Sequence, residues 1–204
     1  MRRILFTTVV CALAGAAHAD EGMWQPAQLP SIAGQLKERG LELDPSQLTD
    51  LAGPTMGAIV SLGFCTASFV SPQGLVVTNH HCAYGAIQYN STAERNLIEQ
   101  GFLAKSIAEE LPGDPNLRIY VTEEIRDVTR EITGKLKPSV GGIERYDAID
   151  AAEKALVKKC EKPGIRCDVY NFHGGYSFQL VRQREIKDVR LVYAPPDAIG
   201  KFGG

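Results

Sequence analysis

The sequence predicts a mainly β fold with peripheral helices. From Gly57 onward, short runs rich in β-branched and aromatic residues alternate with turn signals, the pattern of short strands. Helical spacing is confined to the N-terminal part and to one later segment. The 204 residues are 44% hydrophobic and 23% charged, an ordinary globular composition that argues against a disordered or low-complexity chain.

The first nineteen residues are typical of a secretory signal peptide. Arg2 and Arg3 precede an apolar stretch over residues 4–17, and Ala17-His18-Ala19 offers an A-x-A cleavage site. The stretch is shorter than a membrane span of about 20 residues; the alternative is a buried N-terminal helix. We therefore expect cleavage after Ala19, a periplasmic or secreted protein, and a single folded part over residues 20–204 without a membrane anchor.

Two short helices are predicted before the strands begin. Apolar residues recur at helical spacing over residues 29–39, and Gly40 follows as a stop signal. The second helix opens at Asp44-Pro45 and ends near Ala52.

Strands are predicted over residues 58–62, 67–70 and 75–78. Ser71-Pro72-Gln73-Gly74 separates the last two as a four-residue turn, so they form a hairpin. Further along, the pattern predicts a loop with one helical turn at 101–111, strands at 117–122 and 125–132 (the second with a helix as alternative), an amphipathic helix at 143–159, and strands at 169–172, 176–182 and 189–193.

Four cysteines remain after removal of the signal peptide: Cys65, Cys82, Cys160 and Cys167. In an oxidising compartment an even number indicates two disulfides, with three possible pairings. Sequence proximity favours Cys65–Cys82 and Cys160–Cys167, and a Pro-Gly turn lies between the second pair. The alternative is a zinc site built from Cys65, Cys82 and a histidine, although the spacing of a zinc motif is absent.

The candidate catalytic side chains lie where the predicted hairpin ends, at His80 and His81. An imidazole with an ordinary pKa of about 6.5 takes and returns a proton near neutral pH. Adjacent histidines point in different directions, so at most one would be a general base. The alternative is a pair of loop histidines without a role. His173 is a candidate for a second catalytic or metal histidine, but its place before Gly174-Gly175 favours a turn.

The segment from Cys65 to Cys82 resembles the catalytic-histidine region of chymotrypsin-like serine peptidases. More specifically, the mature chain is similar to the S46 family of bacterial dipeptidyl aminopeptidases, of the dipeptidyl-peptidase 7 and 11 type. The motifs that carry this resemblance are Asp20-Glu21-Gly22-Met23-Trp24, Ala67-Ser68-Phe69-Val70-Ser71, Gly74-Leu75-Val76-Val77-Thr78-Asn79-His80-His81-Cys82 and Phe102-Leu103-Ala104.

The resemblance implies the fold and the site. It implies a chymotrypsin-like β-barrel, the incomplete N-terminal barrel of a double-barrel serine peptidase. It selects His81 as the catalytic general base of a Ser-His-Asp triad and pairs Cys65 with Cys82. It further implies release of dipeptides from peptides with a free N-terminus, no metal or other cofactor, and a homodimer.

The other two triad groups are expected outside these residues. In the family the aspartate follows a Gly-Gly-Asp-x-Asp-Asn-Trp-like stretch, and the serine lies near the end of a much longer chain. The available carboxylates do not match that motif, and Ser68 and Ser177 lack a nucleophile motif. These carboxylates are Asp127, Asp147, Asp150 and Asp168. We therefore expect residues 20–204 to be the truncated N-terminal part of the catalytic domain, inactive alone.

A second hypothesis is a non-catalytic exported module, a peptidase-like barrel that binds peptides or a partner. The absence of serine and aspartate motifs favours it, whereas His81 beside Cys82 argues against it. Nucleic acid is excluded as a partner by the balance of 22 Lys and Arg against 24 Asp and Glu, which leaves a net charge of −2.

Overall fold

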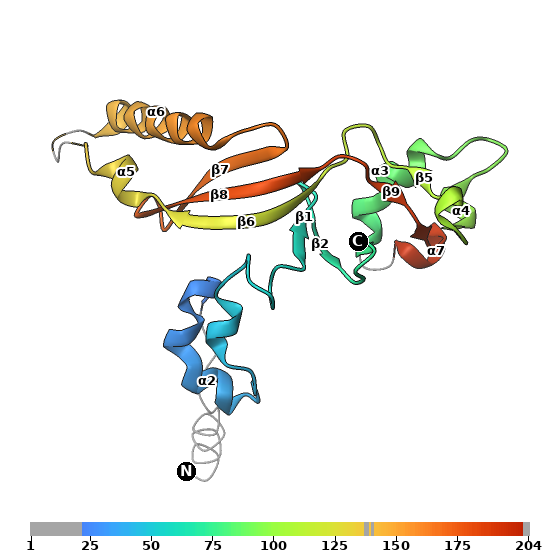
Figure 1. The fold of residues 1–204 in the computed structure, drawn as a ribbon, viewed down its shortest axis with the longest axis horizontal. Coiled ribbons are helices and arrows are strands. Elements are labelled where there is room, and N and C mark those ends of the chain that lie inside the picture. Colours follow the sequence, from blue (N-terminus) through green and yellow to red (C-terminus); the bar gives the residue numbers. More distant parts are fainter. Residues whose placement is uncertain (1–21, 137–138, 140, 202–204) are drawn as a thin grey trace, which may run out of the picture.

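A six-stranded antiparallel sheet forms the centre of the fold, in the order β3-β2-β1-β6-β8-β7 (Figure 1). The computed structural model describes residues 22–136, 139 and 141–201, so the predicted signal peptide lies outside the described residues. The six strands are β1 (Ile59–Ser61), β2 (Thr66–Phe69), β3 (Val76–Val77), β6 (Ile119–Asp127), β7 (Ile165–Phe172) and β8 (Ser177–Ile186).

Before the sheet, the chain forms short helical segments that stand away from it (Figure 1). The predicted helix at 29–39 divides into the 3-10 helix η1 (Pro26–Ile32) and the α-helix α2 (Ala33–Glu38). Pro30, which lacks an N–H, lies in the first part. The second predicted helix is shorter than expected, η2 (Pro45–Leu48), and Asp44 caps it by accepting a hydrogen bond from the backbone N–H of Ser46 at 2.9 Å.

The predicted hairpin is confirmed as β2 and β3. Ser68 faces Val77 and Phe69 faces Val76 across the pair. The backbone N–H of Val70 donates to Leu75 at 2.9 Å and closes the turn. Gly74 adopts φ +89°, a conformation that glycine reaches without steric cost. This hairpin delivers the chain to the candidate histidines.

The two strands predicted at 117–122 and 125–132 are instead one long strand followed by a helical turn. β6 runs without a break to Asp127, with a register irregularity between Thr122 and Glu124. The short helix α5 (Thr129–Thr133) then replaces the end of the second predicted strand. The Asp127 carboxylate accepts the Thr129 N–H at 2.8 Å, a local side-chain-to-backbone bond just before this turn.

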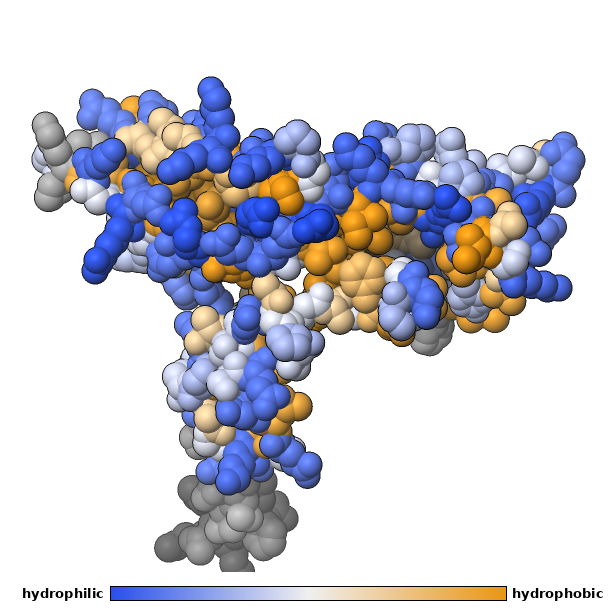
Figure 2. Space-filling model, viewed as in Figure 1, coloured by the Kyte–Doolittle hydropathy of each residue, from blue (hydrophilic) through white to orange (hydrophobic). Residues whose placement is uncertain are grey.

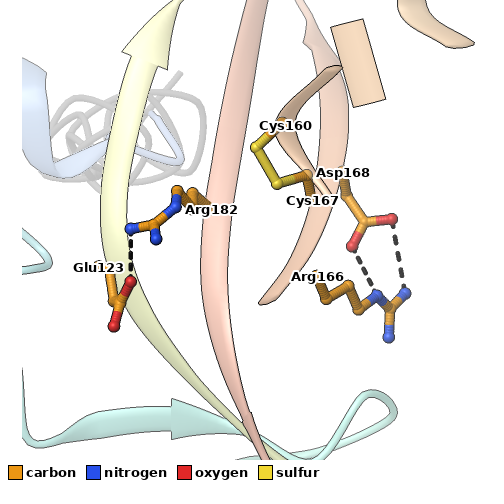
Figure 3. The surroundings of a disulfide bond; sticks show 6 residues. All are labelled: Glu123, Cys160, Arg166, Cys167, Asp168 and Arg182. Atoms are coloured by element: carbon orange, nitrogen blue, oxygen red, sulfur yellow. Dashed lines mark hydrogen bonds and ion pairs between the residues drawn. A yellow bond between two sulfur atoms is a disulfide. The ribbon is translucent and has the colours of Figure 1, made fainter. Parts of the chain in front are cut away.

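Charged side chains pair across the long β6–β8–β7 ribbon. Glu123 on β6 accepts from Arg182 at 2.5 Å and from Arg184 at 2.6 Å, both on β8. On β7, Arg166 pairs with Asp168 at 2.8 Å. Figure 3 shows the Glu123–Arg182 and Arg166–Asp168 pairs beside the second disulfide. The Arg166–Asp168 pair lies along one strand, whereas the pairs of Glu123 cross from β6 to β8 and explain how so charged a segment forms a strand.

The predicted amphipathic helix is confirmed as α6 (Gly142–Cys160), which lies along the outer half of the sheet (Figure 1). Its apolar residues Ile149, Ala152 and Leu156 pack against a cluster of buried side chains beneath the helix, the outer core. Cys160 at the end of α6 is bonded to Cys167 of β7. The buried members of the outer core are Val128, Ile132, Cys167, Phe178 and Leu180.

The segments between the strands form two small two-stranded sheets and several helices. β4 (Phe102–Leu103) pairs with β10 (Tyr193–Ala194), and β5 (Leu111–Pro112) pairs with β9 (Arg190–Leu191). The helices here are α3 (His80–Tyr89), α4 (Leu97–Gln100), η3 (Ile107–Glu109) and α7 (Asp197–Gly200). Except for the single turn η3, these helices were not predicted. The buried residues Ile87, Leu97, Leu191 and Ala194 hold this region together.

The prediction of a mainly β fold with helices is confirmed, but a closed barrel is not. Among the described residues, β3 and β7 are the two edges of an open sheet. The helices of this part of the chain include none long and apolar enough to cross a membrane. Figure 2 shows apolar surface over the middle of the molecule, where β1, β2 and α3 meet in Figure 1.

Candidate active site

The candidate site is the junction between strand β3 and helix α3. Here Thr78 donates its hydroxyl to the carbonyl of Thr66 at 2.8 Å, which ties the end of the hairpin to β2. Asn79 is extended, with φ −71° and ψ 149°, and the helix begins at His80. The histidines, predicted on a loop, therefore lie in the first turn of a ten-residue helix.

A disulfide fixes this first turn to the sheet. Cys65, next to the start of β2, is bonded to Cys82 of α3, with the Cα atoms 6.1 Å apart. Cys82 is 5% exposed and belongs to the inner core, the cluster beneath the site. The other buried members of the inner core are Val60, Leu62, Ala67 and Ile119. The helix start is thus held covalently and by packing.

The two histidines have different surroundings. His81 is exposed, and one of its ring nitrogens lies within 4.8 Å of the sulfurs of Cys65 and Cys82. His80 is half-buried and meets Tyr84 edge-on, with ring centroids 6.2 Å apart. The imidazole of His81 is therefore open to solvent, whereas the ring of His80 packs against its neighbours.

Cys65, His81 and Cys82 are also the residues of the zinc alternative. Their ligand atoms come together as that alternative required. However, a zinc site needs cysteine thiolates, and here the two sulfurs are bonded to each other. In this oxidised state the pair anchors the helix and does not offer thiolate ligands.

The candidate carboxylates are engaged elsewhere. Asp127 accepts the Thr129 N–H at the start of α5, and this bond lowers the pKa of its carboxyl. Asp150 pairs with Lys154 at 2.7 Å along α6. Asp168 pairs with Arg166 on β7, and Asp147 lies exposed on α6. Among the described residues, these four are not brought to His81 by any hydrogen bond or ion pair that the structure shows.

Of the other singled-out residues, His173, Tyr176 and Ser177 lie at the β7–β8 turn, whereas Ser68 lies opposite Val77, the last residue of β3. His173 adopts φ +53° in the turn between β7 and β8, as the glycine pair after it predicts. Tyr176 in the same turn is 85% exposed, and Trp24 is 45% exposed. Ser68 lies on β2 and Ser177 begins β8.

One contact at the site had no signal in the sequence. Gly200, the last residue of α7, lies against the ring of His80, so that a Cβ built on Gly200 would be 2.5 Å from His80 Cγ and 2.7 Å from Nε2. The two residues are 120 positions apart along the numbering. Only the folded chain brings them together.

Comparison with known proteins places this site in context. The model of the peptidase S46 family matches residues 19–204. The chain is 53% identical over 205 residues to an Asp/Glu-specific dipeptidyl-peptidase of Shewanella putrefaciens. This alignment covers all of this chain and 28% of that protein. It is 36% identical over 212 residues to a dipeptidyl-peptidase 7 of Phocaeicola vulgatus, covering 99% of this chain and 29% of the relative.

Solved structures have a similar fold. DPP11 of Porphyromonas endodontalis in complex with the dipeptide Arg-Glu matches with a TM-score of 0.78 and 33% identity, over 91% of this chain and 28% of that one. The same protein in complex with substrate gives a TM-score of 0.77 and 35% identity, over 90% and 28%. This chain therefore spans under a third of the length of these relatives.

Proposed function

The chain belongs to the peptidase S46 family, and from this premise we propose that it supplies the N-terminal part of an exported, serine-type dipeptidyl aminopeptidase with His81 as the general base. Relatives matching the full length of this chain are dipeptidyl-peptidases by name. Their greater length supports the view that the serine and aspartate come from residues beyond these 204.

The proposed chemistry follows the logic of a Ser-His-Asp triad. His81 takes the proton from the serine hydroxyl as that oxygen attacks the carbonyl of the second residue of the peptide. The protonated imidazole then gives the proton to the leaving amine, and a water molecule hydrolyses the acyl-enzyme by the same route in reverse. The aspartate holds the imidazole in the required tautomer.

The observation that carries the proposal is the fixation of an exposed histidine. General-base catalysis needs a side chain that is open to the substrate yet held in place. His81 is exposed, and its helix turn is anchored by the Cys65–Cys82 bond and by the Thr78–Thr66 hydrogen bond.

The test is turnover of a dipeptide joined to a fluorogenic amine, with the complete native gene product. We expect His81→Ala to lower kcat by about 10²-fold to 10⁴-fold, the usual contribution of a general base. His173→Ala is the matched control, because it removes an exposed histidine from a distant turn. It should leave kcat unchanged. Equal activity of wild type and His81→Ala would overturn the proposal.

Labelling with a fluorophosphonate tests the serine mechanism separately. The reagent modifies a serine that is activated by its histidine, so wild type should gain one label and His81→Ala should gain little. The intact mass of the protein purified from its source tests its length. A mass matching residues 20–204 alone, together with absence of turnover, would favour a non-catalytic module.

A further inference from the structure

The contact between His80 and Gly200 links the start of α3 to the end of α7. The plane of the imidazole lies so close to Gly200 that a methyl group there would overlap the ring at Cγ and Nε2. A real Cβ essentially never comes within 3.0 Å of such atoms. Position 200 therefore has room for glycine only, as long as the ring of His80 stays where it is.

Backbone conformation does not explain the glycine. Gly200 is not among the glycines with positive φ, and it lies in a helical turn, where alanine is the better residue. By contrast, Gly85 in α3 has open space where its Cβ would be and also lacks positive φ. The two glycines differ in one respect that matters, the ring against Gly200.

The ring of His80 has little freedom to move aside. Tyr84 packs edge-on against it, and Cys82, two residues along, is tied to Cys65. His80 Nε2 is buried and has no hydrogen-bond partner within the described part of the chain. The contact that the described residues do show for this ring is its close approach to Gly200.

The opposite side of the contact is also fixed. α7 follows β10 after Pro195 and Pro196, and β10 pairs with β4, with Ala194 opposite Phe102. Gly101 lies so close to Ala194 and Pro196 that a Cβ on it would be 2.8 Å from each. The segment that leads into α7 is thus held against Gly101, and α7 brings Gly200 to the ring of His80.

We infer that His80 is a positioning residue: its ring, seated on Gly200, sets the first turn of α3 against α7 and thereby fixes the direction of His81. This inference rests on the proposed function, because it matters for turnover only if His81 is the base. It assigns the two adjacent histidines separate tasks. His81 handles protons, and His80 acts through packing alone.

Steady-state kinetics of the complete native gene product test the inference. Gly200→Ala should lower kcat by about 10-fold to 100-fold, since a displacement of about 1 Å at a catalytic group costs up to 10²-fold. KM should change less than about twofold, because the displaced group acts in the chemical step. Gly85→Ala is the matched control and should leave kcat and KM unchanged.

The pair of substitutions gives a double-mutant cycle. His80→Ala removes the ring that Gly200→Ala strikes, so the double variant should be no slower than His80→Ala alone. His80→Leu restores bulk without nitrogens and should recover most of the kcat lost in His80→Ala. A merely unfolded variant would lose the amide protection of β1 and β2, which hydrogen exchange reports.

Each outcome has one meaning. If Gly200→Ala behaves like Gly85→Ala, or if the two effects multiply in the double variant, the positioning role is wrong. If His80→Leu is as inactive as His81→Ala, His80 acts through its nitrogens and the inference also fails. If His81→Ala retains full turnover, the proposed function fails instead, a result visible before any His80 variant is measured.

Discussion

Removal of the Cys65–Cys82 bond should loosen the candidate site by a predictable amount. The two cysteines are 17 positions apart, and in the chain-entropy model a crosslink over about that many residues stabilises by about 3 kcal/mol. Replacing both cysteines by alanine should therefore lower the free energy of opening around the site by about 3 kcal/mol. Turnover should fall too, since His81 precedes the released residue.

Native-state hydrogen exchange is the suitable assay, because it reports opening of one region within a larger protein. Two backbone amides report this opening. The N–H of Leu62 donates to the carbonyl of Cys65 at 2.7 Å, and the N–H of Phe69 donates to the carbonyl of Ala58 at 2.9 Å. The Cys160–Cys167 bond is the control. Its cysteines are 7 positions apart, so its loss should cost about 2 kcal/mol, confined to the outer core, with turnover retained.

The two disulfides should differ in their effect on turnover when each is removed. Equal loss of turnover on removing either bond would refute the claim that Cys65–Cys82 holds His81 in place. Unchanged exchange at Leu62 and Phe69 would refute the claim that this bond secures the inner core.

Two further predictions concern the outer half of the fold. Phe178 is 1% exposed in the outer core, so Phe178→Ala should lower the free energy of unfolding by about 3–5 kcal/mol. Tyr176 is 85% exposed, so Tyr176→Ala should change it by less than about 0.5 kcal/mol. Denaturant unfolding compares the two variants, and equal losses would contradict the assigned core. The Asp127 carboxyl should titrate below its usual 3.8 because the Thr129 N–H holds its charged form. Because its pKa is lower in the folded state, its contribution to stability is complete above pH 3.8 and is lost as the pH falls through the folded value. An ordinary pKa in an NMR titration would contradict this prediction. A pH dependence of stability that Asp127→Asn leaves unchanged would contradict it too.

Local patterns predicted the elements that depend on neighbouring residues. The β2–β3 hairpin follows from its four-residue turn, and α6 follows from the spacing of Ile149, Ala152 and Leu156. The structure joins Cys65 to Cys82 and Cys160 to Cys167, the pairs that proximity favoured. In each case a few residues close in sequence determine the outcome.

Distant partners decide the elements that were missed. α3 has no side-chain cap at Asn79, and its start is secured by Cys65, seventeen residues away from Cys82. Strand β6 has Glu123 and Glu124 in its middle, and the arginines that pair with Glu123 come from β8. The spacing of residues along one segment does not carry such information.

The candidate site divides in the same way. The motif identified the position of His81, and a local pattern placed its chain at the end of a hairpin. The seat of His80 on Gly200 joins two segments that are distant in sequence. Glycine at position 200 is also uninformative alone, because a turn explains a glycine equally well.

Strand β6 connects the two cores of the sheet. It begins at Ile119 in the inner core, and Val128, directly after its end, belongs to the outer core. Nine residues of strand span about 30 Å, so the surface of α6 and the surroundings of His81 are separate neighbourhoods. Substitutions or labels attached to the exposed face of α6 should then leave the surroundings of His81 unchanged.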